Sequence, residues 1–361
     1  MKNLIVMTVA ASAAAGSVSA GGIERSTFNS ALLFEDGNYM ELSFGLVDSD
    51  VSGVSVPGFG STPSGDMAST FNSLTFGYKR QLSDNLSMAL IVDQPVGANV
   101  AYPAGPYPFA GSTADVESLA VTGLLKYTTP DNLSFYGGLK AERLKGEVFI
   151  PFFGNYSLST DTDVSFGYVV GAAWEKPDIA ARVALTYTSA IDHTLASSES
   201  AAGPVALVSS FESTVPQSLQ LDFQTGVAAD TLVFGSVRWV DWSEFQVLPP
   251  LFAGGSGGLP IAAYDSDYIT YSLGIGRRFS EKWSGAITLT HEPASGDLMR
   301  NLGPIDGFSS ISVGATYTMD NVKITGGIRY AKLGDATTTT IGSSFSGNDA
   351  VAVGLKVGYS F

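Results

Sequence analysis

The feature that most constrains this chain is an alternation of apolar and polar residues with a period of two. This pattern places one set of side chains on each face of a strand, and it recurs along almost the whole chain. Most of the segments span roughly 10 to 14 residues, the length of a tilted strand in a membrane barrel. Fourteen segments show it: 38–47, 69–80, 85–93, 115–128, 132–145, 162–175, 179–192, 215–228, 231–244, 265–279, 282–292, 307–319, 321–333 and 349–361.

The last segment shows the two faces best. Val351, Val353, Leu355, Val357, Tyr359 and Phe361 share one face, and Ala352, Gly354, Lys356, Gly358 and Ser360 share the other. The first face suits lipid and the second suits a wet lumen. The terminal aromatic residue also resembles the assembly signal of bacterial outer-membrane barrels. A soluble β-sandwich could alternate too, but fourteen such segments in series favour the barrel.

The connections alternate in length. Short turns, such as those at Pro130-Asp131 and Pro177-Asp178, carry the expected turn residues. Barrels of this class have short periplasmic turns and longer extracellular loops. We therefore predict an all-β, membrane-spanning antiparallel barrel of fourteen strands over residues 38–361. The long loops are 48–68, 94–114, 146–161, 193–214, 245–264, 293–306 and 334–348.

The beginning of the chain reads as a targeting signal. One cation, Lys2, precedes an apolar run from Leu4 to Ala15, and Val18-Ser19-Ala20 ends in small residues. This pattern is typical of a cleaved secretory signal, which we place at residues 1–20. The longest uncharged run of the remaining chain, 245–264, contains three prolines, which excludes a membrane helix there. We expect the bacterial outer membrane as the location.

Charge and composition exclude several functions. A net charge of −15 argues against nucleic acid, and the absence of cysteine excludes thiol catalysis and disulfides. Only His193 and His291 remain as candidate imidazole ligands or bases, and no recognisable motif surrounds either. Asp192 precedes His193, but neighbours on a strand point to opposite faces. We therefore expect no enzyme activity, metal or cofactor.

The same alternation sorts the charged residues of the strands. It places more cations than anions in the lumen, and such a surplus favours an anionic solute unless the cations pair with acids or lie at the rim. The cations are Lys79, Lys126, Lys140, Arg182, Arg238, Arg278, Lys323, Arg329 and Lys356. The anions are Glu41, Asp93, Glu142, Glu175 and Glu292.

Several predicted extracellular loops are unusually apolar. Exposed clusters of this kind mark a binding surface, unless the loops fold inwards and pack on one another. Both can hold, because loops folded over a barrel mouth can line an apolar pocket. The candidate ligand-binding residues are Phe109, Phe149, Phe152, Phe153, Leu207, Phe211, Leu248 and Phe252.

Four stretches of sequence carry a family resemblance: residues 34–45, 93–98, 185–193 and 238–245. They are similar to the FadL/TodX family of outer-membrane transporters for long-chain fatty acids and other hydrophobic compounds. The resemblance implies a monomeric barrel whose extracellular loops capture the ligand, which leaves through an opening in the wall into the outer membrane. By this analogy the opening lies at the end of the third strand, near Asp93, Pro95 and Gly97.

One departure from the family concerns the plug of the lumen. Family members carry an N-terminal hatch of some forty residues with an Asn-Pro-Ala element. Here only residues 21–37 precede the first strand, and no Asn-Pro-Ala occurs in them. At roughly 3.3 Å per residue they could thread a lumen but not fill one. We predict a reduced hatch, which places a hatch-driven release in doubt.

The leading hypothesis is passive uptake of a hydrophobic ligand, with long-chain fatty acids as the first candidates. Apolar loop residues would hold the chain of the ligand and a lumen cation its carboxylate, because a charge-assisted hydrogen bond suits that role. The candidate cations are Lys140, Arg182, Arg238 and Arg329. The expected partners are the ligand, outer-membrane lipid and lipopolysaccharide. The alternatives are a general diffusion porin for small polar or anionic solutes, and a structural or adhesive surface barrel.

Overall fold

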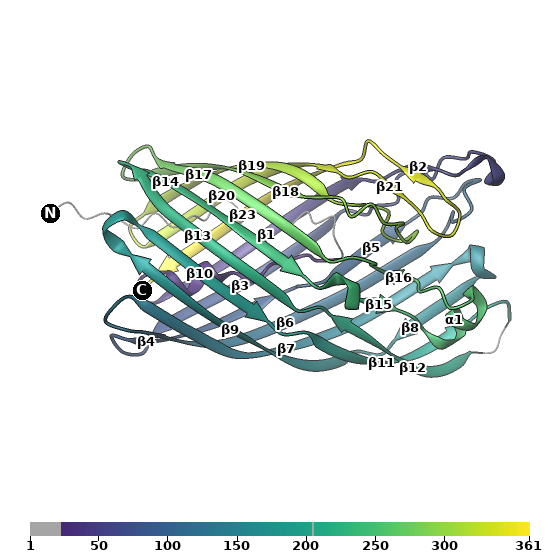
Figure 1. The fold of residues 1–361 in the computed structure, drawn as a ribbon, viewed down its shortest axis with the longest axis horizontal. Coiled ribbons are helices and arrows are strands. Elements are labelled where there is room, and N and C mark those ends of the chain that lie inside the picture. The colour runs from purple at the N-terminus through teal and green to yellow at the C-terminus, as the bar shows by residue number, and fades with distance from the viewer. Residues whose placement is uncertain (1–22, 204–205) are drawn as a thin grey trace.

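The computed structural model describes residues 23–203 and 206–361 of the chain. They form one antiparallel sheet that closes on itself, because β1 (Tyr39–Asp50) pairs with β3 (Phe71–Gln81) along one edge and with β23 (Asp349–Ser360) along the other. Figure 1 shows the tilted wall strands around the axis of the barrel. The predicted signal peptide, residues 1–20, lies outside the described residues.

Eighteen strands make up this sheet, but four wall strands are each broken into two. The broken pairs are β4 (Leu86–Asp93) with β5 (Gly97–Ala101), β8 (Tyr156–Thr160) with β9 (Asp163–Lys176), β10 (Ala181–Thr188) with β11 (Ile191–Ser200), and β12 (Leu207–Val215) with β13 (Ser218–Ala228). The prediction of fourteen strands is therefore confirmed. The unbroken ones are β1, β3, β6 (Thr113–Thr128), β7 (Leu133–Ile150), β14 (Thr231–Val240), β17 (Tyr268–Arg278), β18 (Trp283–Glu292), β19 (Phe308–Met319), β20 (Val322–Leu333) and β23.

The outward face of the wall is apolar, as the alternation predicts. In β1, Met40, Leu42 and Phe44 are exposed, whereas the side chains between them point inwards and are buried. Outward aromatic rings gather towards both ends of the wall, which is the arrangement of residues at the two membrane interfaces. Towards the short turns these are Tyr78, Trp283, Tyr317, Tyr359 and Phe361, and towards the long loops Tyr168, Tyr187, Trp239, Tyr271 and Tyr330.

Two predicted loops are largely strand. β7 continues to Ile150, and β8, β11 and β12 extend the wall on the side of the long loops. The prediction ended these strands too early because β11 is polar on its outward face, at Asp192, Thr194 and Ser198. Polar outward residues are expected where the barrel wall extends beyond the bilayer and its outward face meets water. As a result Phe149, Leu207 and Phe211, which we expected in loops, lie in strands.

The two ends of the barrel differ. Short turns close one end, and Asn132, Ala180, Asp230 and Asp320 adopt left-handed backbone conformations there. At the other end the long connections carry a three-stranded sheet of β2 (Gly53–Val54), β22 (Ser344–Phe345) and β21 (Ala336–Thr337). The short strands β15 (Gln246–Val247) and β16 (Ala262–Ala263) and helix α1 (Pro250–Ser256) lie at the same end, on the right of Figure 1. Over the described ranges, no helix combines the length and hydrophobicity needed to cross a membrane.

Candidate functional site

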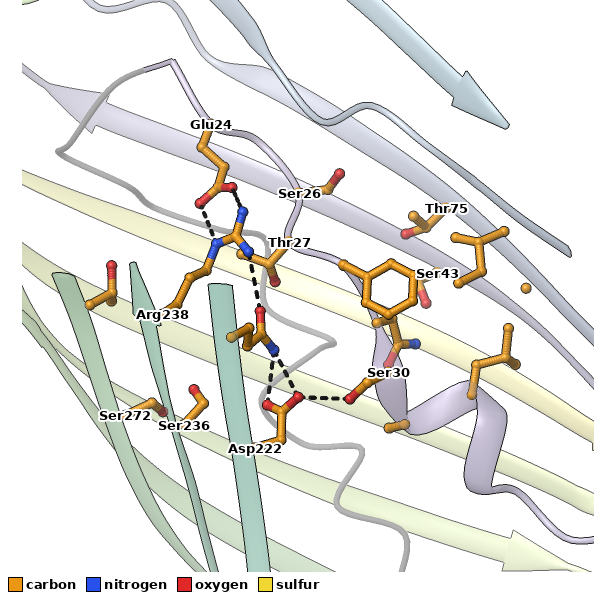
Figure 2. Close-up of a pocket in the computed structure, with 18 of the residues that line it drawn as sticks. Glu24, Ser26, Thr27, Ser30, Ser43, Thr75, Asp222, Ser236, Arg238 and Ser272 are labelled. Carbon is orange, nitrogen blue, oxygen red and sulfur yellow. Dashed lines mark hydrogen bonds and ion pairs between the residues drawn. The ribbon is translucent and has the colours of Figure 1, made fainter. Parts of the chain in front are cut away.

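Residues 23–37, which we call the N-terminal strap, run inside the barrel before β1. The short 3-10 helix η1 (Ser30–Phe34) packs Leu32 and Leu33, both fully buried, against apolar residues of the wall. Ser30 Oγ donates to Asp222 on β13 (2.8 Å), and Asn29 Nδ2 donates to Glu41 on β1 (2.7 Å). The strap therefore contacts inward-facing residues of strands on different sides of the lumen, as Figure 2 shows for its middle part.

The strap also replaces part of the wall's own pairing. The pairing of β3 with β4 runs from Gln81 up to Phe76, which lies opposite Val92. Beyond that point the backbone of the third wall strand bonds to the strap: Arg25 N donates to Pro95 O (2.8 Å), and Gly97 N donates to Ile23 O (2.8 Å). Pro95 has no amide hydrogen to give to a ladder, which explains why the strand breaks here.

A gap in the wall lies beside this break. The cavity there has a volume of about 460 Å³ and is lined by residues of β3, β5 and β6 together with Arg25 of the strap. Arg25 stacks on the ring of Phe71 (4.0 Å from its guanidinium carbon to the ring centre) and donates to Asn99 Oδ1 (2.6 Å). A Cβ atom at position 97 would lie 2.7 Å from Arg25 Nε and 2.9 Å from the backbone oxygen of Val116, so a larger residue here would displace one of these neighbours.

Two ion pairs, together with hydrogen bonds from a lysine to the backbone, hold the strap at both of its ends. Glu24 pairs with Arg238 on β14, and Glu35 pairs with Lys323 on β20 (2.9 Å). Near Glu35, Lys79 Nζ donates to the strap's backbone oxygens at Glu35 and Gly37. The predicted surplus of lumen cations is thus partly offset by acids that the strand alternation did not count.

The remaining predicted carboxylate candidates have partners as well. Lys140 pairs with the fully buried Glu142 (2.7 Å), and the guanidinium of Arg182 lies over the ring of Phe34 (4.3 Å). Arg329 Nε donates to Ser312 (2.9 Å) at the edge of the lumen cavity described below. Whether any of them meets a ligand stays a prediction.

The strap borders four cavities. One is a polar cavity of about 290 Å³ in the lumen, to which residues 24–32 of the strap contribute and whose far side is lined by hydroxyls such as Ser236, Thr270 and Ser272 (Figure 2). A small cavity of about 50 Å³ lies at Asp93, Pro95 and Trp242. A third, of about 140 Å³, lies beneath the loops and is mostly apolar, and the wall gap is the fourth. Residues of the strap thus contribute to the lining of all four.

The long loops pack into an apolar core above these cavities. Phe109 stacks on Phe152 (5.0 Å between ring centres), and Phe153 packs edge to face on Phe252 (5.0 Å). Trp242, which is 2% exposed, contacts Tyr264 (5.3 Å) in the same cluster. Inward packing of the loops, one of the two sequence-based interpretations, therefore describes much of this surface.

A buried carboxylate organises one side of the loop core. Glu199, with no exposed surface, accepts hydrogen bonds from Tyr156 Oη (2.8 Å) and from the backbone amides of Leu251 (3.2 Å) and Phe252 (3.1 Å) at the start of α1. Across the loops, Tyr102 Oη donates to Asn301 O, and burial raises the pKa of Tyr102 well above its ordinary value. Both contacts join loops that are far apart in the sequence.

The eight predicted apolar ligand contacts separate into two groups. Phe109, Phe211 and Phe252 are buried, and Phe152 and Phe153 join the same ring cluster as Phe109. Leu248 is half-buried after β15. Phe149 and Leu207 lie outside this ring cluster; they are 37% and 42% exposed, as Phe152 is at 38%, and Phe149 is on the outward face of β7.

Neither histidine is hydrogen-bonded to a catalytic triad of the Ser-His-Asp kind among the described residues. His193 is fully buried and its Nδ1 lies 2.8 Å from Asp163 Oδ2, but the neighbouring Ser165 hydroxyl donates to Asp163 rather than facing the imidazole. His291 contacts only the hydroxyl of Ser309 through Nδ1 (2.9 Å) among the described residues. In the part of the chain that the structure describes, no cluster of three or more His, Asp or Glu side chains could hold a metal ion.

Comparison with known proteins places this arrangement in context. A family model described as outer membrane protein transport protein (OMPP1/FadL/TodX) matches residues 6–361. A Pseudomonas aeruginosa FadL homologue superposes with a TM-score of 0.74 at 16% identity, covering 92% of each chain. The Pseudomonas putida toluene transporter TodX gives 0.67 at 14% identity over 98% of each chain. The CymD monoaromatic hydrocarbon channel gives 0.60 at 13%, over 92% of this chain and 90% of its own. No curated protein matches the chain.

Proposed function

Because this chain belongs to the FadL/TodX family of outer-membrane transport proteins, we propose that it carries long-chain fatty acids or monoaromatic hydrocarbons passively into the outer membrane. The family consists of outer-membrane channels for hydrophobic compounds, and the FadL and TodX relatives suggest these two ligand classes. The observation that carries the proposal is the broken third wall strand, with a wall gap on one side and an apolar cavity on the other.

The proposed path begins at the loops. The apolar cavity beneath them is lined by Val51, Met67, Tyr264 and Leu302, and it reaches the strap at Ile23. Burying apolar ligand surface there is favourable by about 25 cal/mol per Å². Phe152 and Phe153, whose rings are only partly covered, are the proposed first contacts, since Phe109 and Phe252 are already committed to the loop core.

The proposed exit is the wall gap near Asp93, Pro95 and Gly97. It opens where Leu74 on β3 and Gln94 face each other without a regular ladder, and the Gln94 side chain accepts a bond from Leu74 N across it (3.3 Å). A ligand leaving here enters the lipid sideways. We propose a monomer surrounded by outer-membrane lipid and lipopolysaccharide, a surrounding that the apolar outward face of the wall supports.

A cross-link across the gap tests this path. The chain has no cysteine, so cysteines at Leu74 and Gln94 would form the sole disulfide. Uptake of labelled hexadecanoate or toluene into proteoliposomes should fall several-fold in the oxidised form and recover on reduction. The matched control joins Phe76 and Val92, which already pair directly below the gap, and should leave uptake unchanged. Equal uptake by both oxidised forms would contradict lateral exit.

The polar lumen cavity supports a second candidate, a porin for small polar or anionic solutes. Its hydroxyl-lined wall could pass hydrated solutes to the periplasm if the strap leaves room. Single-channel recording distinguishes the two: a large, steady conductance, with hydrophobic ligands neither bound nor transported, would favour the porin.

A further inference from the structure

A row of polar side chains crosses three neighbouring wall strands on the outward face, on the side of the long loops. Lys332 on β20 lies opposite Ser309 on β19, and Ser309 lies opposite His291 on β18. All three side chains are exposed. Because neighbouring strands are about 4.8 Å apart, Lys332 and His291 lie about 10 Å from each other, with Ser309 between them. The row therefore presents an ammonium, a hydroxyl and an imidazole to one small area outside the barrel.

The next outward row towards the short turns is apolar. It consists of Tyr330, Ile311 and Leu289, which lie opposite one another on the same three strands and are 48%, 45% and 57% exposed. A change from polar to apolar side chains within two residues along each strand is expected at the boundary between lipid head groups and hydrocarbon. A lipid whose phosphate lies at the polar row would therefore place its acyl chains against the apolar row.

The polar row has hydrogen-bond donors that can face lipid. Asp349 on β23 lies opposite Lys332, but its carboxylate accepts from Tyr330 Oη (3.2 Å), and among the described residues Lys332 makes no ion pair. His291 Nδ1 lies 2.9 Å from Ser309 Oγ. With a proton on Nδ1 the imidazole donates to Ser309, which leaves the hydroxyl proton of Ser309 free to donate to a lipid.

We infer that Lys332, Ser309 and His291 form a binding site for a phosphate group of lipopolysaccharide in the outer leaflet. The inference rests on the proposed lipopolysaccharide surroundings of the barrel and names a site for them; it does not depend on the ligand that the channel carries. A phosphate accepts several charge-assisted hydrogen bonds, and a phosphate monoester such as those of lipid A carries about −1.5 to −2 charges at pH 7. The phosphodiester of a phospholipid carries a single charge and therefore binds more weakly.

Other outward positions at this end of the barrel are less suited to a phosphate. Asp267 presents a carboxylate that accepts from Trp239 Nε1 (3.0 Å), and Asp192 on β11 is exposed as well. Carboxylates repel a phosphate. On β7 the exposed Lys145 already pairs with Glu117 (3.0 Å). The unpaired lysine on β20 is therefore the better partner for a lipid phosphate, and the paired lysine on β7 is a matched control.

The substitution Lys332→Gln tests the site in the whole barrel, purified in mild detergent and titrated with lipid A that carries both of its phosphates. Native mass spectrometry measures the bound lipid at each concentration. We expect the affinity to fall about tenfold, which corresponds to about 1.4 kcal/mol, and His291→Gln to lower it about threefold. Lys145→Gln removes an exposed lysine at the same end of the barrel and should change the affinity less than twofold.

Two further probes identify the lipid. Lipid A without phosphates should bind the parent and Lys332→Gln equally, and phosphatidylglycerol should bind the parent more weakly than phosphorylated lipid A does. Binding of lipid A should persist in EDTA, since side chains and not a divalent cation meet the phosphate. Equal losses in Lys332→Gln and Lys145→Gln, a loss that remains without phosphates, equally tight binding of phosphatidylglycerol, or release by EDTA would each overturn the site.

Uptake of hexadecanoate separates this inference from the proposed function. Lys332 lies on the outward face, away from the proposed path, so Lys332→Gln should take up hexadecanoate as the parent does. A parent protein that takes up neither hexadecanoate nor toluene would refute the proposed function and leave the result with lipid A standing.

Discussion

The loop core and the lumen are two packed regions of one barrel, and they are held by different forces. Above, Phe109, Phe252 and Trp242 pack ring against ring with little exposed surface. Below, Leu32 and Leu33 of the strap pack on apolar wall residues, but the two ends of the strap are held by the ion pairs of Glu24 and Glu35, next to a cavity lined with hydroxyls. When an apolar contact is lost from a water-free core, no other contact replaces it. A polar contact, in contrast, can be exchanged for one with water or a ligand.

This difference separates the loop core, whose packing is fixed, from the strap, whose polar contacts can be exchanged for others. A densely packed core resists small displacements, so the loop core can hold a pocket in a fixed shape. We expect the end of the strap that carries Glu24 to be displaced more easily, because each of its polar contacts is individually worth only about 0.5–3 kcal/mol. The predictions below test this division, first where the loop core should lose most and last where the strap should move most easily.

The largest effect is expected from Phe252→Ala in the loop core. Removing this buried ring, which packs on Phe153 and Tyr156, should lower stability by about 3–5 kcal/mol. Hydrogen exchange of the loop amides would measure it, with Val208→Ala, 80% exposed, as the control. A change below about 1 kcal/mol would mean that the loops are not one cooperative core.

The next effect concerns Glu199→Ala. Its removal leaves Tyr156 Oη and the amides of Leu251 and Phe252 without their acceptor, at a cost of about 2–3 kcal/mol. Glu199→Gln keeps an acceptor and should recover part of the loss. Thermal unfolding and exchange at α1 report both values, and full stability of Glu199→Ala would show that water satisfies these donors.

Ligand binding should distinguish rings that face the cluster from those that face outwards. Phe153→Ser removes contact area from the proposed capture site and should weaken binding of a labelled fatty acid about tenfold. Phe149→Ser, on the outward face of β7, should change affinity less than twofold. If Phe153→Ser lowers stability without altering affinity, this ring belongs to the loop core alone.

The smallest change in stability is expected for Arg25→Ala in the strap. The cation–π contact with Phe71 and the bond to Asn99 together contribute about 1 kcal/mol, so global unfolding should barely shift. Transport should respond more: we expect faster uptake of hydrophobic ligand in proteoliposomes, since the wall gap loses its inner cover. Unchanged uptake would show that Arg25 does not limit passage.

Much of the barrel could be predicted from residues close in sequence. The lipid-facing alternation located all fourteen wall strands. The family resemblance, not the alternation, directed attention to Pro95 and Gly97, and an opening there stays a prediction. The alternation failed where the outward face turns polar, as in β11, because the pattern then no longer contrasts lipid with lumen. It also could not tell Phe149, on an outward face, from Phe109, inside the ring cluster.

What the sequence by itself determined is the closed barrel with its lipid and lumen faces, because each strand carries its own period-two signal. What only the tertiary structure decided is how the lumen charges are matched and what covers the wall gap. Glu24 and Arg238 are 214 residues apart, and the strap has no periodic pattern to indicate its path. Such contacts arise only when the closed wall brings distant residues within hydrogen-bonding distance, which is why the site could not be predicted from local pattern alone.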